Sequence, residues 1–69
     1  MKLSARNVLK GKVKEITHGA VDTEVVLELA PGVEIVSIIT KRSAESLGLK
    51  VGDSACAIIK APTVIIGVE

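Results

Sequence analysis

The feature that most constrains this chain is the presence of strands that are apolar on both faces in a sequence of only 69 residues. In the stretch 54–59, Cys56 and Ile58 project one way, and the apolar residues between them project the other way. The stretch 63–68 has the same character. One face of each strand in a small lone sheet meets water and should be polar. Apolar groups on both faces therefore indicate that another chain covers the outer face.

The shortness of the chain leads to the same conclusion. A domain of this size buries only about 60% of the surface of its unfolded chain, and small domains usually need a disulfide, a metal or oligomerisation. The single cysteine excludes a disulfide within the chain, and Cys56 and His18 are too few soft ligands for a structural zinc site. Oligomerisation is the remaining route.

Composition excludes several classes of function. Phe, Tyr and Trp are absent and the net charge is +1, which argues against a nucleic-acid-binding domain that stacks bases on aromatic rings. No stretch approaches the roughly 20 apolar residues that span a bilayer, and the start MKLSARN does not resemble a signal peptide. We therefore expect a cytoplasmic protein with no membrane partner.

Alternation with a period of two predicts the first two strands, and apolar runs bounded by turn residues predict three more. In the first of them, Lys10, Lys12 and Lys14 share one face. The five expected strands cover residues 8–17, 20–30, 33–39, 54–60 and 63–68, with turns at His18-Gly19 and Pro31-Gly32.

One helix is expected, between the third and fourth strands. Thr40 can cap it, residues 41–47 form about two turns, and Gly48 is placed to end it. Five strands with a short helix at this place match an OB-type barrel.

Three clusters of hydrogen-bond donors are suited to binding an anion: residues 4–7, 40–43 and 60–63. A helix N-terminus attracts anions, and Lys41 and Arg42 in its first turn are unfavourable for the helix dipole unless an anion lies nearby. Each cluster also has an ordinary explanation. The first could be a solvated terminus, the second a helix cap, and the third, with Lys60, the end of a strand.

No arrangement of residues suggests catalysis, so we do not expect an enzyme. The chain has one histidine, no nucleophile paired with a base, no Gly-rich phosphate loop and no metal-ligand cluster. Cys56 lies in an apolar run and is expected to be a buried, inert thiol. His18 is expected to be a solvated turn residue.

The clusters occur in an order that resembles the molbindin, or Mop, family, whose module also occurs in molybdate-responsive regulators and at the end of molybdate transporter ATPases. The motifs are S-A-R-N followed by L-K-G-K-V, then S-I-I-T-x-x-S, then I-K-A-P/S-x-V-I-I. They match residues 4–7, 9–13, 37–43 and 59–66. The resemblance covers the whole chain and implies that residues 1–69 form a single Mop domain of the TOBE type.

The resemblance implies an all-β fold, a five-stranded OB-like barrel with one short helix. It also implies that strands swap between chains to give dimers, and that three dimers form a hexamer. Molybdate or tungstate would be held at subunit interfaces for intracellular molybdenum storage and homeostasis. Carried over by motif, the oxyanion-binding residues are Ser4, the Arg6 amide, Thr40, Ser43, Lys60 and the Ala61 amide.

A second type of oxyanion site near a symmetry axis is also implied by the resemblance. The motifs do not place it, and the turn at His18, Gly19 and Ala20 is the candidate that we name.

The chemistry of the clusters suits this ligand, because molybdate is a tetrahedral dianion that accepts hydrogen bonds and donates none. None of the three clusters contains Asp or Glu. Two alternatives to an oxyanion store remain at this point, a nucleic-acid-binding OB domain and an effector-sensing or structural subunit of a larger complex. The sequence does not separate molybdate from tungstate, or storage from buffering or delivery.

Overall fold

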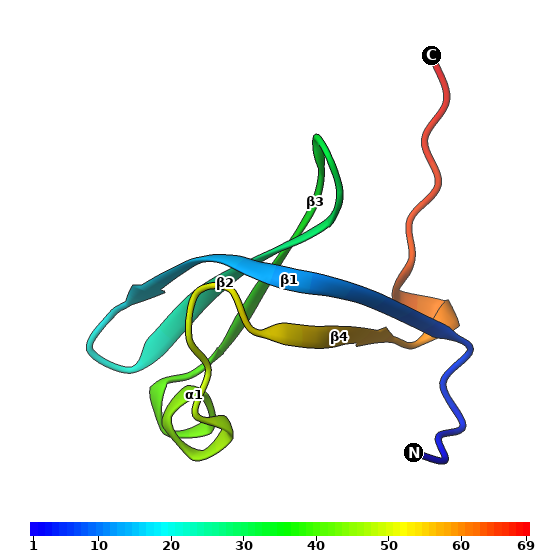
Figure 1. Ribbon diagram of the computed structural model, residues 1–69. Coiled ribbons are helices and arrows are strands. Elements are labelled where there is room, and N and C mark those ends of the chain that lie inside the picture. Colours follow the sequence, from blue (N-terminus) through cyan, green and yellow to red (C-terminus); the bar gives the residue numbers. More distant parts are fainter.

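The computed structural model describes all 69 residues, and its four strands form one antiparallel sheet with the order β3-β2-β1-β4. The sheet curls into an open half-barrel, and a short α-helix lies at one end of it (Figure 1). The elements are β1 (Asn7–His18), β2 (Asp22–Ala30), β3 (Val33–Thr40), α1 (Lys41–Leu47), β4 (Ser54–Ile59) and the 3₁₀ helix η1 (Ala61–Thr63).

The curl arises from β1, which pairs with different partners along its length. Its first half pairs with β4, from Asn7 opposite Ile59 to Lys12 opposite Ser54. Its second half pairs with β2, from Lys12 onward. Lys12 is therefore the one position of β1 that pairs on both sides, and the sheet bends where the strand changes partner.

A β-bulge at Lys14 strengthens this bend. The register passes from Val13 opposite Leu27 directly to Glu15 opposite Val26, so Lys14 is the extra residue. The Lys14 ammonium donates a hydrogen bond to Glu34 of β3. This bond and the nearby carboxylate charges raise the pKa of Lys14 above its ordinary value. The bulge lysine thus links β1 to β3 across the outer surface of β2.

The core is small and lies on the concave face of the sheet. Val13, Val25 and Leu27 form its centre, and partly buried Ile16, Ile35, Ile39, Leu49, Ala55 and Ala57 surround them. Only 6 of the 69 residues are buried in the single chain. A core of this size contributes little net stability after conformational entropy is subtracted, which agrees with the expected need for partner chains.

The predicted helix is confirmed in position and in its caps. Thr40 is the N-cap, and its side chain accepts a hydrogen bond from the Ser43 N–H. Gly48 ends the helix in the left-handed conformation, with φ of 62°, which a residue with a Cβ adopts at a cost. Four of the five predicted strands are also confirmed, with ends that differ by one or two residues.

The prediction of a fifth strand is wrong for the single chain. Ala61–Thr63 form a 3₁₀ turn, and residues 64–69 continue as an extended tail that pairs with no strand. The tail leads away from the sheet (Figure 1), and Ile65 and Val68 are each 93% exposed. The barrel is consequently open. The apolar run correctly indicated extended backbone, but a strand also needs a neighbouring edge, which this chain does not offer at that point.

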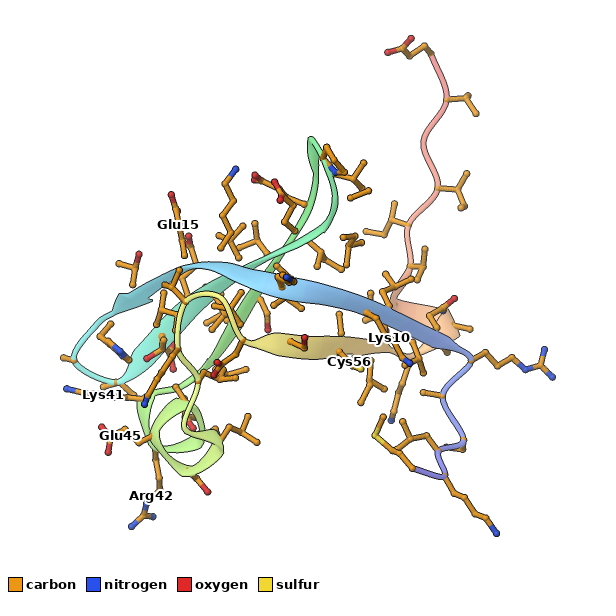
Figure 2. The ribbon with its side chains drawn as sticks, in the orientation of Figure 1. Lys10, Glu15, Lys41, Arg42, Glu45 and Cys56 are labelled. Carbon is orange, nitrogen blue, oxygen red and sulfur yellow. The ribbon has the colours of Figure 1, made fainter.

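The prediction of a buried Cys56 is also wrong for the single chain. Cys56 is exposed on the convex face of β4, opposite Lys10 of β1 (Figure 2). Residues of β4 alternate between exposed and partly buried, and it is Ala55 and Ala57 that pack against the core instead. An apolar run shows no alternation from which its inner face could be read.

Neither helical segment is long and apolar enough to cross a membrane.

Candidate functional site

Two of the three donor clusters meet at one end of the sheet. The ladder between β1 and β4 ends at Asn7 opposite Ile59, so the segment before β1 and the segment after β4 emerge side by side. The Asn7 side chain donates a hydrogen bond to the Ile59 carbonyl at 3.2 Å and closes this end. A surface hollow lies between the two segments, and its lining is Ser4, Ala5, Arg6, Lys60, Ala61 and Pro62.

The residue types that line this hollow suit an anion. Its lining residues include Ser4, which carries a hydroxyl, and the cationic residues Arg6 and Lys60, and no acidic residue lines it. The Ala61 N–H donates to no other group of the protein. Four of the six residues expected to bind the oxyanion therefore line one hollow. Ala5 and Pro62 also line it, and sequence reasoning placed them in the clusters without assigning them to the site.

The other two expected residues, Thr40 and Ser43, lie elsewhere. Thr40 ends β3 and caps α1, and Ser43 lies in the first turn of α1, at the opposite end of β4 from η1 (Figure 1). Figure 2 shows Lys41 and Arg42 of α1 well apart from Lys10, which lies on the half of β1 that pairs with β4. One chain does not bring Thr40 and Ser43 to the hollow, so a single site containing all six residues requires more than one chain.

The hydrogen bonds at Thr40 limit what it can offer. Its hydroxyl accepts from the Ser43 N–H at 3.0 Å and donates to the Ser43 hydroxyl oxygen at 2.8 Å. The Thr40 proton is thereby used within the cap, and the Ser43 hydroxyl proton is left to reach an external acceptor. No acidic side chain lies in the first turn of α1, which keeps this helix end suitable for an anion.

The turn named for a second site is largely occupied by its own hydrogen bonds. His18 is the last residue of β1, and its Nδ1 lies 3.0 Å from the hydroxyl of the fully buried Thr23. The Gly19 N–H donates to the Asp22 carbonyl at 2.7 Å. The Ala20 N–H has no partner in the chain.

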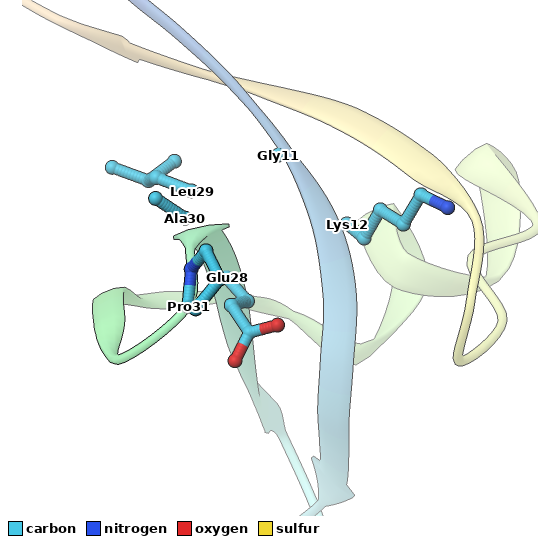
Figure 3. Close-up of a pocket in the computed structure, with 6 residues that line it drawn as sticks. All are labelled: Gly11, Lys12, Glu28, Leu29, Ala30 and Pro31. Carbon is cyan, nitrogen blue, oxygen red and sulfur yellow. The ribbon is translucent and has the colours of Figure 1, made fainter.

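A different hollow lies where β1 and β2 part, and it does not suit an oxyanion. Gly11, Lys12, Glu28, Leu29, Ala30 and Pro31 line it. Figure 3 shows the Glu28 carboxylate beside Pro31, while the Lys12 ammonium lies on the other side of β1. A carboxylate repels a dianion, so this hollow is not the oxyanion site. No group of three or more His, Cys, Asp or Glu side chains converges as a metal site.

Comparison with known proteins identifies close relatives over the whole chain. The model of the TOBE domain matches residues 3–66. Molybdenum-pterin-binding protein 3 of Clostridium pasteurianum is 50% identical over 66 residues, which are 96% of this chain and 97% of that protein.

Solved structures agree in fold as well as in sequence. MopII from Clostridium pasteurianum superposes with a TM-score of 0.90 at 48% identity, covering 97% of this chain and 100% of that one. The cytoplasmic molybdate-binding protein ModG, in a form with molybdate bound, superposes with a TM-score of 0.94 at 55% identity. That match covers all of this chain and 49% of the ModG chain.

Proposed function

Because this chain belongs to the TOBE domain family and is similar over its whole length to Mop proteins, we propose that it binds molybdate and stores it for molybdenum homeostasis. The observation that carries the proposal is the carboxylate-free hollow between residues 4–6 and 60–62. It combines a hydroxyl, a free backbone N–H and two cations, and these groups all favour a tetrahedral dianion.

The proposed site contains Ser4, the Arg6 amide, Lys60 and the Ala61 amide from one end of the sheet. Thr40 and Ser43 of another chain complete it, because the two ends of one chain do not meet. Charge-assisted hydrogen bonds contribute about 1.5–3 kcal/mol each. Four or five of them reach the roughly 8 kcal/mol of a micromolar complex before desolvation is subtracted. The turn at His18, Gly19 and Ala20 remains the proposed place of a second site.

The assembly that we propose is a hexamer built from three dimers with swapped strands. The tail at residues 64–69 is the segment that would swap, since it is extended, apolar and unpaired in one chain. The edge strands of another chain offer it hydrogen bonds, and its burial would supply the core that one chain lacks. We take residues 1–69 as a single domain.

We further propose that the protein acts in the cytoplasm as a binding protein rather than an enzyme, without nucleic acid or membrane partners. The relative ModG is a cytoplasmic molybdate-binding protein, and the Clostridium relatives are named molybdenum-pterin-binding proteins. Tungstate has the same charge and shape as molybdate and should bind as well.

Native mass spectrometry with and without molybdate tests the function and the assembly together. We expect a hexamer that gains a fixed number of molybdate ions. A folded monomer that takes up no molybdate would contradict both proposals.

Calorimetry tests the selectivity of the site. Molybdate and tungstate should bind with similar affinity, while sulfate is a smaller tetrahedron that cannot reach all donors at once. Phosphate is partly protonated at neutral pH and would place a donor against a donor. Sulfate binding as tight as molybdate binding would refute the assignment.

A further inference from the structure

The turn that follows β4 holds a backbone carbonyl with two hydrogen bonds from one residue. Thr63 donates its hydroxyl to the Lys60 carbonyl oxygen at 2.8 Å, and its N–H donates to the same oxygen at 3.0 Å. The Lys60 carbonyl therefore points into the turn. Thr63 itself does not line the hollow, so the proposed function leaves this arrangement without a role.

The Lys60 carbonyl and the Ala61 N–H belong to the same peptide unit. A trans peptide is planar, and its C=O and N–H point in opposite directions; no peptide bond in the protein is cis. Fixing the carbonyl oxygen toward Thr63 thus fixes the Ala61 N–H in the opposite direction, out of the turn. Ala61 lines the hollow, and its N–H has no partner in the chain.

We propose that Thr63 is a positioning residue that orients the Ala61 N–H toward the bound oxyanion. This inference rests on the proposed function and adds a residue that no anion contact would reveal. Pro62 supports the same orientation, since its ring fixes φ and limits the conformations of the turn. An amide that is already oriented loses less entropy when it donates to the ligand.

A substitution can remove the hydroxyl of Thr63 without changing the size of the side chain. Thr63→Val keeps the shape and the backbone bond but deletes the hydroxyl donor, and Thr63→Ser keeps the donor. We expect Thr63→Val to weaken molybdate binding about two- to ten-fold, the effect of one neutral hydrogen bond. Thr63→Ser should bind with near wild-type affinity. Calorimetry on the assembled proteins measures both, and equal affinity of Thr63→Val and wild type would overturn the inference.

Amide NMR tests whether Thr63 orients the Ala61 N–H or only stabilises the turn. In wild type, saturating molybdate should shift the Ala61 amide resonance more than that of Val64, whose N–H donates to the Ala61 carbonyl inside the turn. In Thr63→Val, that shift of Ala61 should be smaller. An unchanged Ala61 shift in Thr63→Val, or no shift in wild type at saturation, would overturn the role of Thr63. The wild-type measurement stands even if Thr63→Val fails to assemble.

The failure of this inference can be distinguished from the failure of the proposed function. If wild type does not bind molybdate, the proposed function fails. If wild type binds and Thr63→Val behaves identically, the function stands and Thr63 has no part in it.

Discussion

The Asn7 side chain donates a hydrogen bond to the Ile59 carbonyl, and this bond joins the start of β1 to the end of β4 beside the proposed oxyanion site. Ser4 and Arg6 lie on one side of this bond, and Lys60 and Ala61 lie on the other. The distance between the two halves of the hollow therefore depends on Asn7.

Replacing Asn7 should loosen the site without destroying the fold. Asn7→Ala removes one partly buried hydrogen bond and should lower the free energy of unfolding by about 1 kcal/mol. Molybdate affinity should fall as well, because the donors on the two segments are no longer held together. Thr17→Ala, an exposed change at the other end of β1, is the matched control and should leave the affinity unchanged. Equal molybdate affinities for the two variants would show that Asn7 does not help to hold the site together.

Lys60 should be the main cation of the site. Lys60→Ala removes a charge-assisted contact with a dianion and should cost about 2–4 kcal/mol of binding free energy, or roughly thirty- to a thousand-fold in affinity. Lys60→Arg should also weaken binding, since a planar guanidinium does not replace a compact ammonium among tetrahedral oxygens. Titration with molybdate measures both variants.

The control for Lys60 is Lys50→Ala, which changes an exposed lysine in the loop before β4 by the same chemistry. Wild-type affinity in a Lys60→Ala protein that is still oligomeric would mean that Lys60 only ends a strand.

A substitution in the exposed tail, residues 64–69, tests whether another chain covers it. Ile65 is 93% exposed in one chain, so Ile65→Glu should be harmless to a monomer. If another chain buries the tail, an unpaired charge there is very costly, and Ile65→Glu should be insoluble, unfolded or dissociated. Ile65→Val should remain assembled. Analytical ultracentrifugation that finds Ile65→Glu in the wild-type oligomer would rule out burial of the tail.

The raised pKa of Lys14 predicts that the free energy of unfolding depends on pH in alkaline solution. Its pKa in the folded chain is raised by its hydrogen bond and charge interaction with Glu34. A raised folded pKa contributes stability at pH values below the unfolded pKa, and that contribution is lost as the pH rises through the folded pKa. The stability difference between wild type and Lys14→Met should therefore persist at neutral pH and vanish in strongly alkaline solution.

Urea unfolding across this pH range measures the difference, and it should be small because both side chains are partly exposed. Lys12→Met is the control, since Lys12 forms no ion pair in the chain. A difference for Lys14→Met that stays constant into alkaline solution would show that the ion pair is not its source.

Local pattern in the sequence was sufficient to predict most of the secondary structure. Period-two alternation placed β1 and β2, apolar runs between turn residues placed β3 and β4, and the Thr40 cap with Gly48 placed α1, because each of these signals acts over a few neighbouring residues. Two of the three donor clusters, at residues 4–7 and 60–63, could also be recognised, since donors without carboxylates are visible in the sequence itself.

Which strands and which donor clusters lie next to each other became known only from the tertiary structure. The register of Asn7 opposite Ile59 brought two clusters together and left Thr40 and Ser43 at the far end of β4. It also placed Cys56 on the convex face and left residues 64–69 without a neighbouring strand. Register and edge pairing depend on contacts between residues far apart in the chain, whereas alternation and capping do not. The sequence could therefore supply the donors of the site, but their assembly into a hollow required the fold.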